Sequence, residues 1–296
     1  MKLQLNKIVF LMIILITALV LPSNFLWKVE CSEGSAKIYL LGSVHIVPDS
    51  VYPLSDVIED AFERSDYLVV EADMKNLDIA KTQMLMMQKG LYTDGRNLRS
   101  VLSEETYKKL EKAVEEIGMI PMMQLNMMKP WLVSLTLPQL MIVDQGLDPE
   151  KGIDMHFLSK AKNAEMEILE LESADFQMEL LSGFDEKTQI AMLENTLEEL
   201  PEFKEKFEKM VAAWSSGDID KMEEIIEKEH GGKKELGVFY DKLITERNHS
   251  MTEKVISYLE SKDGKTYFVV AGSGHMVGKT GIVNQLKEKG YKITRL

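Results

Sequence analysis

The chain has 296 residues, of which 45% are hydrophobic and 28% are charged, a balance typical of a globular protein and unlike that of a disordered or fibrous one. Its formal net charge of −13 argues against binding through phosphate neutralisation, which needs clustered Lys and Arg, so nucleic acid is excluded as the main partner. A single cysteine, Cys31, excludes an internal disulfide, a Cys-x-x-Cys redox pair and a zinc ribbon.

The N-terminal segment has the pattern of an export signal. Lys2 and Lys7 precede an uninterrupted apolar run at 8–21, which is shorter than the roughly 20 residues of a full membrane span. No clear small-x-small cleavage site follows, so residues 1–24 are predicted to be either a cleaved signal peptide or an N-terminal membrane anchor. Both alternatives predict an exported protein, either secreted and extracellular or tethered to the membrane and facing outward.

The first elements after this segment predict strands around a helix. Residues 26–30 and 37–41 are short apolar or alternating runs that predict a hairpin. The segment 48–65 has apolar residues at helical spacing, and 67–73 predicts a buried strand. Strand, helix and strand within about 37 residues form a βαβ unit, in which we expect the two strands to pair in parallel.

Helices are predicted for most of the middle of the chain. Residues 103–118 form one of them, with a cap near Ser103 and Thr106 and a stop at Gly118. Pro130 and Pro138 are expected to interrupt the chain between this helix and the next. The remaining predicted elements are a helix at 152–164, a strand at 165–173, helices over 174–262 with breaks at Gly183, Pro201, Gly217 and Gly231-Gly232, a strand at 266–272, a helix at 281–289 and a closing strand at 291–296.

This order of elements predicts the fold class. Strands at both ends of the chain with helices between them indicate an α/β fold, in which the termini meet in one sheet. The sheet is expected to be mixed, central and built from N- and C-terminal βαβ-like segments. A large helical insertion or cap, at about 76–142 and 174–262, would belong to the same single domain, 26–296. The 20 Met, clustered near Met84 and Met123, are either soft core filler or the lining of an adaptable groove.

The segment AGSGHMVGKTG, 271–281, ends in a Gly-Lys-Thr that resembles a phosphate-binding loop. That loop requires a glycine five residues before Gly278, where this chain has Ser273. Too few residues follow Thr280 for the rest of a nucleotide-binding sheet. Nucleotide is therefore excluded as a ligand, and the Gly-Lys-Thr is interpreted as the first turn of the last helix.

The histidine inside this segment belongs to a repeated motif. VVAGSGH at 269–275 repeats YLLGSVH at 39–45, although 18 Gly and 5 His in 296 positions predict about 0.3 Gly-x-x-His pairs by chance. Each motif directly follows a predicted strand, and its glycine would permit a sharp exit from that strand. We therefore expect His45 and His275 to lie over the carboxyl ends of the strands, where α/β proteins bind ligands.

A carboxylate follows the third predicted strand. Glu71 comes after three buried apolar residues, a position that is costly unless the carboxylate has a partner or solvent. Two histidines and one carboxylate at one sheet edge suit a divalent transition metal with open positions for water. Each residue alone has an ordinary interpretation, as a satisfied loop histidine or a turn-capping carboxylate. The repeated motif favours the metal site.

The predicted late helix offers Arg247, Asn248 and His249 side by side. Successive helical positions point about 100° apart, so all three cannot face one site. Arg247 would stabilise an oxyanion or anchor a substrate carboxylate, and a surface salt bridge is the equally good alternative.

Taken together these segments resemble the TraB/GumN family, which includes the Tiki metalloproteases and is related to the erythromycin-esterase and ChaN-like folds. The resemblance covers about 26–296. It is carried by LWKVE, YLLGSVHIVPDSVYPL, a strand ending in VEAD, GIDMHF, ILELES, ERN and the terminal YFVVAGSGHMVGKTGIVNQLKEKGYKI.

The resemblance implies a set of functional residues. His45, Glu71 and His275 correspond to the residues of the metal centre, and Arg247 and Asn248 correspond to the recurrent Arg-Asn of the late helix, which we count with Glu71 as catalytic. The implied activity is that of a metal-dependent peptidase, with Mn²⁺ or Co²⁺ as the ion and Zn²⁺ as a further candidate. Asp154 matches the Gly-Ile-Asp of the family.

The hypothesis from the sequence is a metallohydrolase that acts on an exported or extracellular peptide or protein. Asp73 or Asp154 would serve as general base; the remaining candidates for substrate contact or support of the ligands are Gly42, Ser43, Gly272 and Ser273. Two alternatives stay open. One is a non-catalytic protein of the same fold that binds or sequesters a peptide, and the other is an esterase-like hydrolase.

Overall fold

A computed structural model describes residues 24–31, 36–229 and 234–296. The predicted leader with its apolar run at 8–21, residues 32–35 of the predicted hairpin and the predicted break at Gly231-Gly232 lie outside these ranges. Among the described residues, none of the helices has the length and apolar character needed to cross a membrane.

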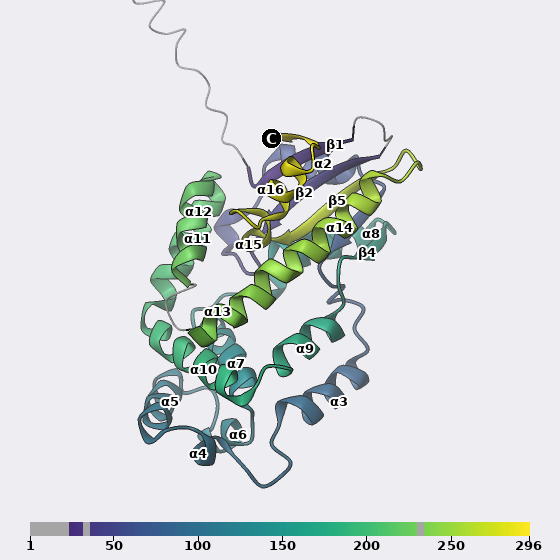
Figure 1. Cartoon of the computed structure of the whole chain (residues 1–296). Helices are drawn as coiled ribbons and strands as arrows, with labels where there is room; N and C mark the ends of the chain where they lie inside the picture. The colour runs from purple at the N-terminus through teal and green to yellow at the C-terminus, as the bar shows by residue number, and fades with distance from the viewer. Residues whose placement is uncertain (1–23, 32–35, 230–233) are drawn as a thin grey trace, which may run out of the picture.

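Six strands form one sheet in the order β4-β3-β5-β2-β1-β6 (Figure 1). Their bounds are β1 (Leu26–Glu30), β2 (Lys37–Ser43), β3 (Tyr67–Val70), β4 (Glu167–Glu170), β5 (Thr266–Gly272) and β6 (Lys292–Arg295). Strands β2, β5, β3 and β4 are parallel, whereas β1 pairs antiparallel with β2 and β6. The predicted mixed α/β sheet, in which both ends of the chain meet, is confirmed.

The direct pairing expected between the first two parallel strands is wrong. Strands β2 and β3 are parallel to each other, but β5 from the far end of the chain lies between them. Its residues 268–271 are completely buried, because this strand has neighbours on both edges and helices over both faces. The continuous apolar run of β5 is the sequence feature that fits the centre of a parallel sheet.

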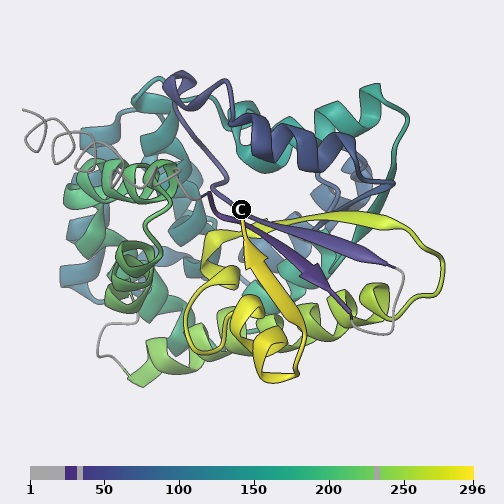
Figure 2. The same ribbon diagram turned by 90° about the horizontal axis from the view of Figure 1, so that it is seen from above.

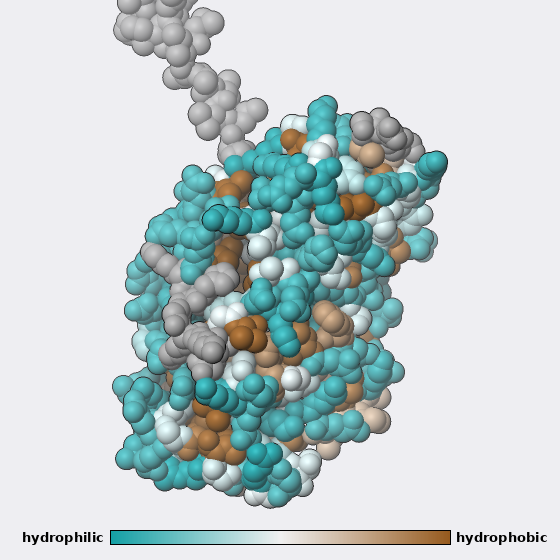
Figure 3. All heavy atoms as spheres, viewed as in Figure 1, coloured by the Kyte–Doolittle hydropathy of each residue, from teal (hydrophilic) through white to brown (hydrophobic). Residues whose placement is uncertain are grey.

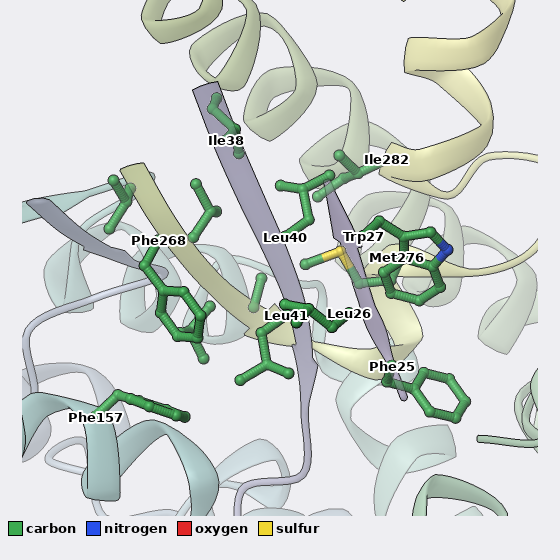
Figure 4. Close-up of a cluster of buried hydrophobic side chains, with 14 of the residues drawn as sticks. Phe25, Leu26, Trp27, Ile38, Leu40, Leu41, Phe157, Phe268, Met276 and Ile282 are labelled. Carbon is green, nitrogen blue, oxygen red and sulfur yellow. The ribbon is translucent and has the colours of Figure 1, made fainter. Parts of the chain in front are cut away.

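Helices cover both faces of the sheet. Figure 2 shows α2 (Asp56–Glu63) and α8 (Ile153–Asn163) on one side and α14 (Arg247–Leu259) and α16 (Ile282–Glu288) on the other. A close-up of the core shows Leu41 of β2 between Phe268 of β5 and Leu26 of β1 (Figure 4). Phe157 of α8 adds its ring to this core, with its centroid 4.8 Å from that of Phe268 and 5.1 Å from that of Phe62.

The other helices gather beside and below the sheet in Figure 1. They are α3 (Ile79–Gly90), α4 (Leu98–Val101), α5 (Glu104–Ile117), α6 (Met122–Asn126), α7 (Pro130–Asp144), α9 (Ala174–Ser182), α10 (Glu186–Glu199), α11 (Phe203–Ser216), α12 (Ile219–Glu229), α13 (Lys234–Tyr240) and the short α15 (Ser273–Met276). Short 3₁₀ turns occupy Asp49–Val51, Pro149–Lys151 and Leu200–Glu202, and Asp241–Glu246 is a π-helical turn. Leu110, Val133 and Leu193 belong to a second hydrophobic core among these helices.

Local signals set the ends of several helices. Ser103 caps α5 by accepting a hydrogen bond from the Thr106 N–H, and Gly118 ends it in the left-handed conformation with φ of 66°, as predicted. Pro130 opens α7 at a position where proline is favoured. The interruption expected at Pro138 is wrong, since α7 continues through it to Asp144.

The aromatic packing on the sheet gives a stability prediction. Phe157→Ala should lower the free energy of unfolding by about 3–5 kcal/mol, because it removes a fully buried ring from between two others. Urea denaturation of the full-length protein measures this. Phe176→Ala is the matched control, since that ring is 44% exposed, and its loss should cost less than about 1 kcal/mol. Equal losses in the two variants would contradict the described core.

Candidate active site

The candidate site lies where the parallel strands end. In the sheet register Ser43 of β2 is opposite Gly272 of β5, and Val70 of β3 is opposite Val270 of β5. His45 follows β2 after one residue, Glu71 directly follows β3, and His275 lies in the short helix α15 after β5. The strand register therefore brings the carboxyl ends of three strands, with these side chains, to one edge of the sheet.

The side chains of Glu71, His45 and His275 all lie close to Gly272. A Cβ atom at this position would lie 3.4 Å from Glu71 Oε1, 3.6 Å from His45 Nε2 and 3.7 Å from His275 Cδ2. The Gly272 N–H donates a hydrogen bond of 2.7 Å to Glu71 Oε1. Gly272 has φ of −51°, which any residue can adopt, so its role is close approach rather than the sharp strand exit expected from the sequence.

Asn248 orients His275. The His275 Nδ1–H donates to Asn248 Oδ1 at 2.6 Å, and Asn248 Nδ2 donates to the Thr280 carbonyl at 3.0 Å, which fixes which way the amide points. This tautomer leaves His275 Nε2 as an acceptor, 3.9 Å from Glu71 Oε2. Burial lowers the pKa of His275 to about 4, so its imidazole is neutral at physiological pH.

Asp154 orients His45 in the same way. The His45 Nδ1–H donates to Asp154 Oδ2 at 2.9 Å, and the Ser43 hydroxyl donates to Asp154 Oδ1 at 2.7 Å. The side chain of His45 is 69% exposed, and the Asp154 carboxylate raises its pKa to about 9. A metal ion at His45 Nε2 would have to replace the proton held there.

The Gly-Ile-Asp segment brings Asp154 to His45. A Cβ on Gly152 would lie 1.9 Å from the His45 carbonyl oxygen, so a side chain cannot be placed there without moving the backbone. The Ile153 N–H donates to the Val44 carbonyl at 3.1 Å. The start of α8 is thereby tied to the loop that carries His45.

A buried ion-pair network holds Glu71. Arg247 Nη2 donates to Glu71 Oε2 at 2.7 Å and to Glu172 Oε2 at 2.8 Å, while its Nε lies 3.0 Å from Glu172 Oε2. Arg247 Nη1 donates to the Leu243 carbonyl at 3.1 Å, in the π-helical turn before α14. The surface salt bridge considered for Arg247 is wrong, because all three charged side chains are buried.

The charge balance keeps Glu71 ionised. Burial by itself would raise the pKa of the Glu71 carboxyl, but His275, His45 and Arg247, together with the Gly272 N–H, lower it to about 2. His249, in contrast, is exposed on the other side of α14. Arg247 and Asn248 therefore both serve the site from adjacent helical positions, whereas the third residue of that triplet does not.

Glu172 and Gln177 are site residues that the sequence reasoning missed. Glu172 stands two residues beyond β4, so the same sheet-edge argument that selected Glu71 would have found it. Gln177 of α9 places Nε2 3.5 Å from Glu71 Oε2 and 3.4 Å from Glu172 Oε2. Its sequence context carries no comparable signal, because it lies inside a helix without a motif.

Other predicted residues have structural partners of their own. The Ser273 hydroxyl donates to the Ser43 carbonyl at 3.0 Å, and a Cβ on Gly42 would lie 3.1 Å from Ser273 Oγ, so the two Gly-Ser pairs fit closely against each other. The Asp73 N–H donates to Glu170 Oε1 at 2.7 Å, and Asp73 Oδ1 accepts from the Lys75 N–H. Of the two candidate general bases, Asp154 contacts a site histidine and Asp73 contacts the loop after β3.

The chemistry of the donors suits a divalent metal, although their spacing is wide. Hydrogen bonds occupy Nδ1 of both histidines, so Nε2 is the atom of each ring that could bind a metal, and Glu71 is an ionised carboxylate. Ligand atoms of one such ion lie about 3 to 3.4 Å apart, less than the 3.9 Å between His275 Nε2 and Glu71 Oε2. Within residues 24–31, 36–229 and 234–296, no group of three or more His, Cys, Asp or Glu side chains is already arranged to hold a metal ion.

Comparisons with known proteins place the chain among relatives. The model of the TraB/PrgY/gumN family matches residues 25–295. The Escherichia coli protein YbaP, whose name calls it uncharacterized, is 23% identical over 254 residues, covering 86% of this chain and 89% of YbaP. Metalloprotease TIKI1 of Xenopus tropicalis is 20% identical over 316 residues, covering 92% of this chain and 61% of that protein. No solved structure gives a significant match.

The network around Arg247 yields a second stability prediction. Glu172→Ala should lower the free energy of unfolding by about 1–3 kcal/mol, because Arg247 stays buried and loses one of its two carboxylate partners. Glu205→Ala is the control, since that carboxylate pairs with Lys209 on the exposed face of α11, and its removal should leave stability unchanged within error. A Glu172→Ala protein as stable as the control would show that Glu172 does not support Arg247.

Proposed function

Because this chain belongs to the TraB/PrgY/gumN family, we propose that it is a metal-dependent hydrolase that cleaves an exported or extracellular peptide or protein. One observation carries the proposal. Two histidines whose Nδ1 atoms are held by hydrogen bonds and one ionised carboxylate surround Gly272. The names of the distant TIKI relatives, which call them metalloproteases, support the same class of activity.

In this proposal His45, His275 and Glu71 hold one divalent ion. When bound, the ion would supply a water of lowered pKa and polarise the scissile carbonyl. Imidazole and carboxylate ligands together suit Mn²⁺, Co²⁺ and Zn²⁺, and we propose Mn²⁺ or Co²⁺ as the working ion. The predicted export segment, which lies outside the described residues, is the basis for placing the enzyme outside the cytoplasm, secreted or membrane-tethered.

The remaining residues would orient these three. Asp154 and Asn248 each accept a hydrogen bond from the Nδ1–H of one histidine and so direct Nε2 of that ring towards the other two side chains. The Arg247 guanidinium donates to Glu71, Glu172 and the Leu243 carbonyl, so we assign it to holding Glu71 in place rather than to binding an oxyanion. Gln177 and Glu172 complete the surroundings of Glu71.

A second candidate is hydrolysis of an ester or peptide without a metal. The exposed pair of His45 and Asp154 favours it, because an imidazole whose Nδ1–H is bound by a carboxylate can transfer protons at Nε2 without an ion. A chelator separates the two candidates. It abolishes turnover in the metal-dependent enzyme and leaves the metal-free hydrolase active.

Metal loading and turnover test the proposal together. After incubation with Mn²⁺ or Co²⁺ and removal of excess ion, the full-length protein should retain about one ion per chain and cleave members of a peptide library. The variant with His45→Ala and His275→Ala should lose the ion and reduce kcat/KM at least about 100-fold. His249→Ala, which removes an exposed histidine of the same chain, should change neither.

Two glycine variants control for loss of fold. Gly272→Ala would place a methyl group beside Glu71, His45 and His275, with its closest contact at 3.4 Å, so the protein should fold but bind less metal and turn over more slowly. Gly274→Ala, whose Cβ would meet Ile226 Cδ1 at 3.8 Å, should behave as the unmodified protein. Equal metal content in the unmodified protein and in the double histidine variant would rule out the proposed centre.

A further inference from the structure

The helical hairpin of α11 and α12 packs against the sheet. Trp214 near the end of α11 and Met222 of α12 are buried, and both belong to the same hydrophobic core as the side chains of β2 and β5. Figure 3 shows hydrophilic atoms over most of the side that α11 and α12 turn to solvent. The apolar side of the hairpin is therefore directed at the sheet.

Trp214 forms a hydrogen bond to the backbone near the end of β2. The pairing of β1 with β2 ends where Leu26 is opposite Leu41. One residue further along β2, the Gly42 N–H donates to the Phe25 carbonyl at 2.8 Å, and the Gly42 carbonyl accepts a hydrogen bond of 2.6 Å from the Trp214 Nε1–H. This bond is buried, and a buried carbonyl that loses its partner is costly. Trp214 therefore fixes the backbone just before β2 ends.

The two residues that precede His45 are held by other segments of the candidate site. The Ser43 carbonyl accepts from the Ser273 hydroxyl at 3.0 Å, and the Val44 carbonyl accepts from the Ile153 N–H at 3.1 Å. The His45 side chain itself is 69% exposed, so packing around the imidazole does little to hold it. The position of this histidine depends on the backbone that carries it.

The same hairpin contacts the segment after the second Gly-x-x-His motif. Glu223 Oε1 of α12 accepts a hydrogen bond from the Gly278 N–H at 2.9 Å. Gly278 is the glycine of the Gly-Lys-Thr that resembles a phosphate-binding loop, and its N–H is thus bound to a carboxylate of the chain itself. At the turn of the hairpin the Arg295 guanidinium donates to the Gly217 carbonyl. The hairpin therefore connects the segments next to both site histidines.

We propose that Trp214 is a positioning residue of the candidate metal centre, which acts through the Gly42 carbonyl to set the position of His45. This inference rests on the proposed function. A metal ligand must lie within about 0.5 Å of its working position, and the residues behind the ligands provide that precision. His275 and Glu71 are buried and have buried partners of their own, whereas His45 relies on its loop.

Cobalt affinity tests this role with a matched pair of tryptophans. Trp131 is also buried, and its Nε1–H donates to the Lys89 carbonyl at 3.2 Å. Trp214→Phe and Trp131→Phe thus remove the same atoms, and urea denaturation should show similar losses of stability. When the full-length protein is titrated with Co²⁺ and the visible absorption of the bound ion is followed, Trp214→Phe should raise Kd about tenfold and Trp131→Phe less than about twofold. Equal weakening by the two variants would overturn the proposal.

A double-variant comparison shows whether Trp214 acts through His45. His45→Ala keeps Glu71 and His275, so weak Co²⁺ binding can still be measured at higher concentrations of the ion. If Trp214 acts through the imidazole, adding Trp214→Phe to His45→Ala should not raise Kd further, whereas independent effects would add. A second rise of about tenfold in the His45→Ala protein would contradict the proposed role.

Hydrogen exchange tests the same role without a metal. In the metal-free protein Trp214→Phe should speed exchange of the Ile153 amide, which donates to the Val44 carbonyl, at least about tenfold, and Trp131→Phe should leave it unchanged. If Trp214→Phe does not fold, 3-benzothienylalanine at position 214 keeps the shape of the ring with sulfur in place of the N–H. The same results are expected of that protein, because it lacks only the hydrogen bond.

The results separate this inference from the proposed function. If the unmodified protein takes up no Co²⁺ and Trp214→Phe still speeds exchange of the Ile153 amide, the metal centre is removed and Trp214 remains the residue that fixes the end of β2. If a folded Trp214→Phe protein binds Co²⁺ with an unchanged Kd, the inference is wrong and the metal centre stands.

Discussion

The site depends on the register of three parallel strands, β2, β5 and β3. Ser43 at the end of β2 lies opposite Gly272 at the end of β5, and β3 ends at Val70, opposite Val270, so that Glu71 follows β3 beside the last residues of β5. A shift of one residue in any of them would move every side chain of that strand to the other face of the sheet. The continuous apolar run of β5 places this strand in the centre of the sheet, where hydrophobic layers cover both of its faces.

The site also requires that side chains and loops come close to the backbone at two glycines. Because Gly272 has no side chain, Glu71, His45 and His275 all come close to its backbone. Gly152 likewise allows the start of α8 to contact the loop that carries His45. The buried charges are then compensated in pairs. Arg247 lies between Glu71 and Glu172, and each histidine donates a hydrogen bond from Nδ1–H to a side chain from a helix, Asp154 of α8 or Asn248 of α14. A buried carboxylate without such partners would be protonated or displaced towards solvent.

The sequence was informative wherever a local pattern has a physical cause. Strand patterning and the repeated Gly-Ser-x-His predicted the α/β class, the meeting of both chain ends in one sheet and the convergence of His45, Glu71 and His275 at its edge. The strand order could not be predicted from the sequence, because pairing between distant segments leaves no local signal. Strand β5 pairs with both β2 and β3, where a direct β2–β3 pair was expected. The partners of Arg247 and the role of Gln177 depend on how helices far apart in sequence pack, which no local pattern records.

Anomalous diffraction from crystals of the full-length protein loaded with Co²⁺ would locate the ion without reference to activity. If His45, His275 and Glu71 form the metal centre, the map will show one strong peak beside Gly272, in contact with Nε2 of both His45 and His275. The absence of a peak at that position, or a peak at other residues with both imidazoles unliganded, would contradict that assignment.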